Sequence, residues 1–182
     1  MSGQAPRLGP DEERAAPALP RAPGDGLREV DAEARALARR LLEGARHGAL
    51  AVLEAGSGHP AASRVALALD ADGVPLILTS TLAAHTVALL TEPRCSLLLG
   101  EPGAGDPLAH PRLTLFGRAC RLERDSPEGR RARALYLQAH PKAALYADFA
   151  DFAFWRIEPQ RASLNGGFGR AWALTAADLA PG

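Results

Sequence analysis

The chain has 182 residues, which is enough for one domain with a full hydrophobic core and too few for two domains of ordinary size. Its 21 basic residues (Lys and Arg) and 21 acidic residues (Asp and Glu) give a formal net charge of zero. Nucleic-acid-binding proteins usually carry a basic excess, so this balance argues against a nucleic-acid partner.

The N-terminus lacks the apolar run of a signal peptide, and no stretch reaches membrane-spanning length. Cys95 and Cys120 both lie within apolar, strand-like runs, as reduced thiols of an intracellular protein do. Neither cysteine has partners at metal-ligand spacing. The sequence therefore predicts a cytoplasmic protein with no membrane partner and no metal site.

Residues 1–27 are rich in Pro, Gly, Ala and charge without an apolar period, which predicts a disordered tail. We expect one domain over 28–176 and a short C-terminal tail over 177–182. The domain opens with a helix over 31–47, where apolar residues recur at helical spacing and Asp31 is the expected N-cap.

Short apolar runs separated by turn residues predict a series of strands. They fall at 49–54, 61–69, 74–80, 95–99, 112–123 and 152–157, with further candidates at 161–164 and 171–174. Helices are expected at 83–90 and 126–140, followed by a helical turn at 142–147. Closely spaced strands with few helices predict a mainly β domain with flanking helices, built as a small antiparallel barrel.

The segment after the third predicted strand concentrates polar groups. Thr79, Ser80 and Thr81 end the strand, and His85 and Thr86 fall in the first turn of the next helix. The free N–H groups of a helix N-terminus favour anions, and hydroxyl groups add donors. The segment therefore predicts a site for a phosphorylated ligand, while Thr79 and Ser80 also fit the role of helix caps.

The order of several motifs resembles the FMN-binding split-barrel family related to pyridoxamine 5′-phosphate oxidase, in its CREG-like and haem-utilisation branch. These motifs are Ser63-Arg64-Val65, Leu78-Thr79-Ser80, His85-Thr86 and Gly166-Gly167-Phe168-Gly169, within a resemblance that covers about residues 34–174. The resemblance implies a split β-barrel of the FMN-binding type. It also implies a homodimer with FMN in each groove between the subunits.

The resemblance also implies which residues hold the cofactor. Arg64 matches the phosphate-binding arginine of the family, and His85 falls where the oxidases place a phosphate-binding lysine. The implied cofactor-binding set is Arg64, Val65, Thr79, Ser80, Thr81, His85 and Thr86. Ala83 and Ala84 replace a serine and an arginine of the oxidases, so we expect weaker or more pH-dependent phosphate binding and no oxidation of pyridoxamine phosphate.

Three functions remain open at this point. The first is a flavin-dependent oxidoreductase, in which the cofactor carries the electron chemistry. The second is a haem-binding or haem-degrading split barrel with His85 as a candidate axial ligand, although related haem-utilisation proteins continue into a C-terminal domain that this sequence lacks. The third is a cofactor-free interaction module in which Arg64 forms an ordinary salt bridge. No Ser-His-Asp or Cys-His arrangement identifies a catalytic residue.

Overall fold

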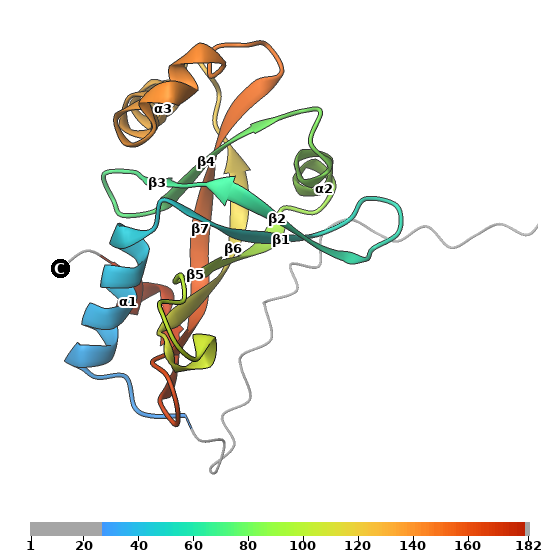
Figure 1. Cartoon of the computed structure of the whole chain (residues 1–182). Coiled ribbons are helices and arrows are strands. Elements are labelled where there is room, and N and C mark those ends of the chain that lie inside the picture. Colours follow the sequence, from blue (N-terminus) through green and yellow to red (C-terminus); the bar gives the residue numbers. More distant parts are fainter. Residues whose placement is uncertain (1–26, 181–182) are drawn as a thin grey trace, which may run out of the picture.

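The computed structural model describes residues 27–180, so the tail predicted for the N-terminus lies outside the described residues except for Leu27. The elements are α1 (Ala32–Gly44), β1 (His47–Leu53), β2 (Pro60–Ala66), β3 (Ala68–Leu69), β4 (Pro75–Ser80), α2 (Ala84–Thr91), β5 (Arg94–Leu99), η1 (Pro107–Ala109), β6 (Arg112–Arg121), α3 (Pro127–Ala139), η2 (Pro141–Leu145), β7 (Phe152–Asn165), β8 (Ala171–Thr175) and η3 (Ala176–Leu179). The predicted mainly β class with flanking helices is confirmed (Figure 1).

The strands of the described chain form one antiparallel sheet in the order β2-β1-β5-β6-β7-β4-β3, with β8 paired to β7. The strand predicted over 61–69 is divided at Leu67, whose N–H donates to the carbonyl of Arg46 at 2.9 Å. β2 and β3, at opposite ends of the strand order, are therefore one bent segment. This bend closes the sheet into a barrel.

The two strands predicted at 152–157 and 161–164 are one long strand, β7. Its first part pairs with β4, and its second part pairs with both β6 and β8. The sequence pattern breaks because the register shifts between Phe116 and Gly117, where Gly117 lies opposite Pro159. Proline has no N–H for a sheet ladder, and such an irregularity accommodates it.

Two apolar clusters lie on opposite sides of the sheet. The inner cluster fills the barrel and includes residues of α1 and α2, such as Ala38 and Leu89. The outer cluster joins α3 to the outward side of β3, β4 and the start of β7, through Tyr136, Leu76 and Phe154. Within residues 27–180, α3 thus covers the outward side of β3, β4 and the start of β7.

The other half of the outer surface has no helix of the described chain packed on it. Strand register and side-chain alternation identify the residues that point outward there. We call this surface the uncovered face, and it consists of Ala49, Ala51, Arg64, Ser96, Leu98, Thr114, Phe116 and Arg161.

The C-terminal part of the described chain is packed against α1. Leu179 is buried, and the Asp178 carboxylate forms an ion pair with Arg35 at 2.8 Å. The backbone N–H of Thr175 is the main cause that lowers the pKa of Asp178. The packed unit therefore extends to Leu179, past the boundary expected at 176. Among the described helices, none is long and apolar enough to cross a membrane.

The first turn of α3 requires a glycine. A Cβ atom at Gly129 would overlap the backbone carbonyl oxygen of Glu123. We expect Gly129→Ala to lower the free energy of unfolding by about 1–3 kcal/mol, as overpacking does, measured by urea denaturation. Gly44→Ala is the matched control, because open space surrounds that position. Equal unfolding midpoints for the two variants would contradict this account.

Candidate functional site

The seven implied cofactor-binding residues lie on two neighbouring parts of the fold. Arg64 and Val65 belong to β2, whereas the other five belong to β4, α2 and the turn between them. Within residues 27–180, no hydrogen bond or ion pair joins Arg64 to this second segment. The structure therefore describes two separate groups of candidate residues.

Arg64 points outward from β2, opposite Ala49 on β1, and is exposed. It forms no ion pair with any residue that the structure describes, so the salt bridge considered above is not found there. An exposed guanidinium without a partner keeps all its N–H donors for an anion. Val65 is buried in the barrel core, so it supports the strand and does not face a ligand.

Two of the predicted hydroxyl groups face the protein interior. Thr79 is 3% exposed and Thr86 is 2% exposed, and neither side-chain oxygen has a hydrogen-bond partner among the described residues. Thr79 lies opposite Ala153 on β7. Because neither hydroxyl reaches the surface, this conformation does not place them to contact a bound phosphate.

The structure also corrects the helix-cap interpretation. The N-cap of α2 is Ala83, which makes no side-chain capping bond. Ser80 instead accepts a hydrogen bond from the N–H of Leu82 at 3.1 Å and donates one to the Asp151 carboxylate at 2.6 Å. The backbone N–H of Thr81 donates to the Asp151 carbonyl at 2.8 Å. Asp151, which the sequence did not place in the predicted site, thus connects the start of α2 to the start of β7.

The first turn of α2 keeps two free donors. The amides of Thr86 and Val87 bond to the carbonyl of Ala83, whereas those of Ala84 and His85 have no acceptor among the described residues. Burial lowers the pKa of the half-buried His85 ring, so the imidazole is neutral at pH 7. A neutral imidazole keeps one nitrogen lone pair for a metal ion.

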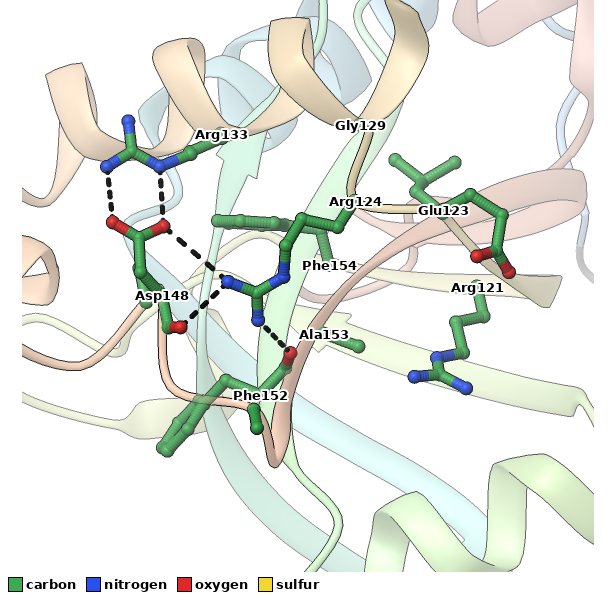
Figure 2. A pocket seen from close by; sticks show the side chains of 12 residues that line it. Arg121, Glu123, Arg124, Gly129, Arg133, Asp148, Phe152, Ala153 and Phe154 are labelled. Atoms are coloured by element: carbon green, nitrogen blue, oxygen red, sulfur yellow. Dashed lines mark hydrogen bonds and ion pairs between the residues drawn. The ribbon is translucent and has the colours of Figure 1, made fainter. Parts of the chain in front are cut away.

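Figure 2 shows a small pocket beside the turn that carries Asp151, formed by residues of β6, α3 and β7. Arg124 donates to the carbonyls of Asp148, Phe149 and Phe152 at 2.8, 2.7 and 3.1 Å. Arg133 holds the Asp148 carboxylate with two hydrogen bonds and lowers its pKa. Because both guanidiniums are occupied, they fix the turn and so position Asp151.

Metal ligation by side-chain clusters has no support in the described part. No group of three or more His, Cys, Asp or Glu residues within 27–180 is arranged to hold a metal ion. Burial raises the pKa of the Cys95 thiol to about 12, so this cysteine is not a thiolate at neutral pH.

A closed antiparallel barrel with one helix-covered half defines the split-barrel class. A solved structure of a Clostridium acetobutylicum protein, described as related to general stress protein 26 and of the pyridoxinephosphate oxidase family, shares this fold. Its TM-score is 0.63 at 14% identity, and the match covers 82% of this chain and 99% of that one. At this identity the likeness concerns the fold alone.

The family model described as CREG, beta-barrel matches residues 29–179, so this chain belongs to the CREG beta-barrel family. The chain is 45% identical over 106 residues to the chloroplastic non-canonical heme oxygenase HOZ of Arabidopsis thaliana. That match covers 57% of this chain and 30% of the plant protein.

A solved heme binding protein from Mycobacterium smegmatis is also similar to this chain. It has 36% identity and a TM-score of 0.75, and the match covers 82% of this chain and 61% of that one. The chain therefore spans less than two thirds of the length of either the plant or the mycobacterial protein.

The bond between Ser80 and Asp151 is open to a direct test. We expect a double-mutant cycle with Ser80→Ala and Asp151→Ala to give a coupling energy of about 1.5–3 kcal/mol, the range for a hydrogen bond to a charged group. The free energies of unfolding of the four proteins are measured by chemical denaturation. Additive effects of the two substitutions would contradict the role assigned to Asp151.

Proposed function

We propose that this protein is a haem-binding split barrel that acts in haem metabolism as a homodimer. The observation that carries the proposal is its 45% identity to a plant heme oxygenase, supported by 36% identity to a mycobacterial heme binding protein. Because the chain spans only part of the length of both relatives, we assign their activities to this chain only as a proposal. Because the plant relative is described as a heme oxygenase, the reaction class proposed for this chain is oxidative haem breakdown.

The uncovered face has the chemistry that haem requires. Haem is a broad, planar, largely apolar ring with two carboxylates at one edge. The side chains of Ala49, Ala51 and Ser96 are small and leave the surface flat enough for such a ring. Arg64 lies at the edge of this surface and has no anionic partner among residues 27–180, so it is available for a carboxylate.

His85 is the candidate axial ligand because it lies in the first turn of α2, which contacts β1 of the uncovered face, and because burial lowers the pKa of its ring and so favours the neutral form. When bound, haem supplies a redox-active iron and an oxidisable ring, and the protein supplies binding, orientation and exclusion of water. The chain contributes Arg64 for the carboxylates and His85 for the iron in this proposal.

A second copy of the chain is the proposed cover for the uncovered face. Leu98 is 45% exposed there, and the surface around it carries small and apolar side chains. A haem lying on one barrel alone would expose its other side to water. Two copies placed face to face would bury both sides of the ring.

FMN binding by a flavin-dependent oxidoreductase is the second candidate function, favoured by the free amides at the start of α2. The hydroxyl of Ser80, however, already donates to the Asp151 carboxylate, which repels a phosphate dianion. The hydroxyls of Thr79 and Thr86 are buried. The residues at the start of α2 therefore fit a phosphate less well than the uncovered face fits haem. For this reason FMN is the second candidate cofactor.

Haem titration tests the first proposal. We expect a Soret band that saturates with added haem, with affinity about tenfold weaker in Arg64→Gln because a charge-assisted bond is lost. We expect His85→Ala to shift the band because the axial ligand changes. Arg40→Gln, on the exposed side of α1, is the matched control. FMN is titrated in parallel: a flavin complex without haem binding would favour the second candidate, and binding of neither would favour a cofactor-free module.

The proposed dimer is tested at Leu98. We expect Leu98→Arg to convert a dimer into a monomer in sedimentation equilibrium, because it adds positive charge to the centre of the uncovered face. Leu145→Arg is the control, since Leu145 is exposed on η2, away from that face. A wild-type protein with the mass of one chain, with and without haem, would refute the homodimer.

A further inference from the structure

Arg161 is a cation held by an aromatic ring. It lies on β7 opposite Phe116 of β6, and its guanidinium carbon sits 3.7 Å from the centre of that ring. The side chain is half-buried, and it makes no hydrogen bond or ion pair with any residue in the described part of the chain. Its Nη1 atom is enclosed without a partner. A half-buried charge without a counter-ion lowers stability, so a residue of this kind calls for an anion.

The strands of the uncovered face offer no unbonded carboxylate for it, because the outward Glu158 of β7, opposite Arg118, is bonded to Arg156 at 3.2 Å. The outward positions of β1, β2, β5 and β6 include no Asp or Glu, although acidic and basic residues are equally numerous in the chain. Arg94 is paired with Glu92, and Arg112 donates to backbone carbonyls. A symmetric partner would present the same outward strand positions, of which the one acid is Glu158, already bonded to Arg156. A carboxylate of a ligand is a counter-charge that fits this position.

The spacing on the sheet brings Arg161 and Arg64 to one ligand. Because Arg161 stacks on Phe116, its guanidinium lies over β6, and β6 is three strands from β2 in the order β2-β1-β5-β6. Three interstrand spacings, with an offset of two residues along the strands, amount to roughly 16 Å. The flexible, exposed side chain of Arg64 shortens this gap when it turns inward. Ala49, Ala51, Ser96 and Leu98 form the floor next to the two arginines.

We propose that Arg161 and Arg64 form a clamp for a planar diacid, in which each guanidinium binds one of its two carboxylates. This inference rests on the proposed haem function and adds a residue and a recognition rule to it. Phe116 holds the Arg161 guanidinium in a fixed plane, which prepares it for a two-bond contact with a carboxylate. The clamp selects tetrapyrroles with two free acids over their esters.

The test compares protoporphyrin IX with its dimethyl ester, by fluorescence titration of wild type, Arg161→Gln, Arg64→Gln and the double variant. We expect each single substitution to weaken binding of the diacid about tenfold and the two together about a hundredfold. We expect binding of the ester to be the same in all four proteins. Arg112→Gln is the matched control, because this arginine lies on the same strand as Phe116 and is already bonded to carbonyls.

Thermal unfolding separates binding from folding. In this proposal Arg161 serves ligand binding and not stability. We therefore expect the melting temperature of Arg161→Gln to be no lower than that of the wild-type protein. Wild-type affinity of Arg161→Gln for the diacid would overturn the clamp and leave the haem proposal standing. An equal loss of affinity for diacid and ester would also overturn the clamp. Failure of the wild-type protein to bind haem or either porphyrin would overturn both.

Discussion

The bend at Leu67 is the constraint on which the rest of this fold depends. It lets one segment pair with β1 on one side and with β4 on the other, so an open sheet becomes a barrel. Both backbone groups of Leu67 are held: its N–H bonds to Arg46, and its carbonyl accepts a hydrogen bond from Nε2 of His140 at 2.6 Å. The donor role fixes a proton on that nitrogen. The end of α3 thus holds the barrel closed.

The contact between His140 and Leu67 also explains why a helix covers only one side of the outer surface of the barrel. His140 packs against Tyr136, with ring centres 4.9 Å apart, and Tyr136 packs against Phe154 on β7. These contacts place α3 on the side of the barrel that is formed by β3, β4 and the start of β7. The helices α1 and α2 send their buried residues into the inner core. Within the described chain, no helix is then left to cover the outward side of β1, β2, β5 and β6, where Arg64 and Phe116 lie.

Sequence reasoning reached the elements because local signals govern them. Asp31 caps α1 by accepting from the N–H of Ala34 at 2.8 Å, and Gly73 adopts a φ of 75° in the predicted hairpin turn. The small antiparallel barrel followed from the order of these elements, and the split-barrel type followed from the resemblance of the motifs to a known family. It did not reveal the side of the sheet that each residue faces. Thr79 is buried because of its register with β7, and Arg161 meets Phe116 only because of the irregularity one residue further along β6. Such pairings join residues far apart in the chain, and composition and periodicity do not encode them.

The distribution of charge distinguishes the two cofactor proposals. At the start of α2 the free backbone amides lie near the Asp151 carboxylate, which accepts a hydrogen bond from Ser80. Arg124 and Arg133 bond to other groups of the same turn and so hold Asp151 in place. A phosphate dianion would approach that carboxylate against like charge. On the uncovered face the distribution of charge is reversed: unpaired arginines border a floor of small neutral side chains, and the outward positions of β1, β2, β5 and β6 carry no acid. An anion gains most where cations have no internal partner. A broad, flat ligand with acids at its edge is therefore the chemistry that this half of the barrel accepts.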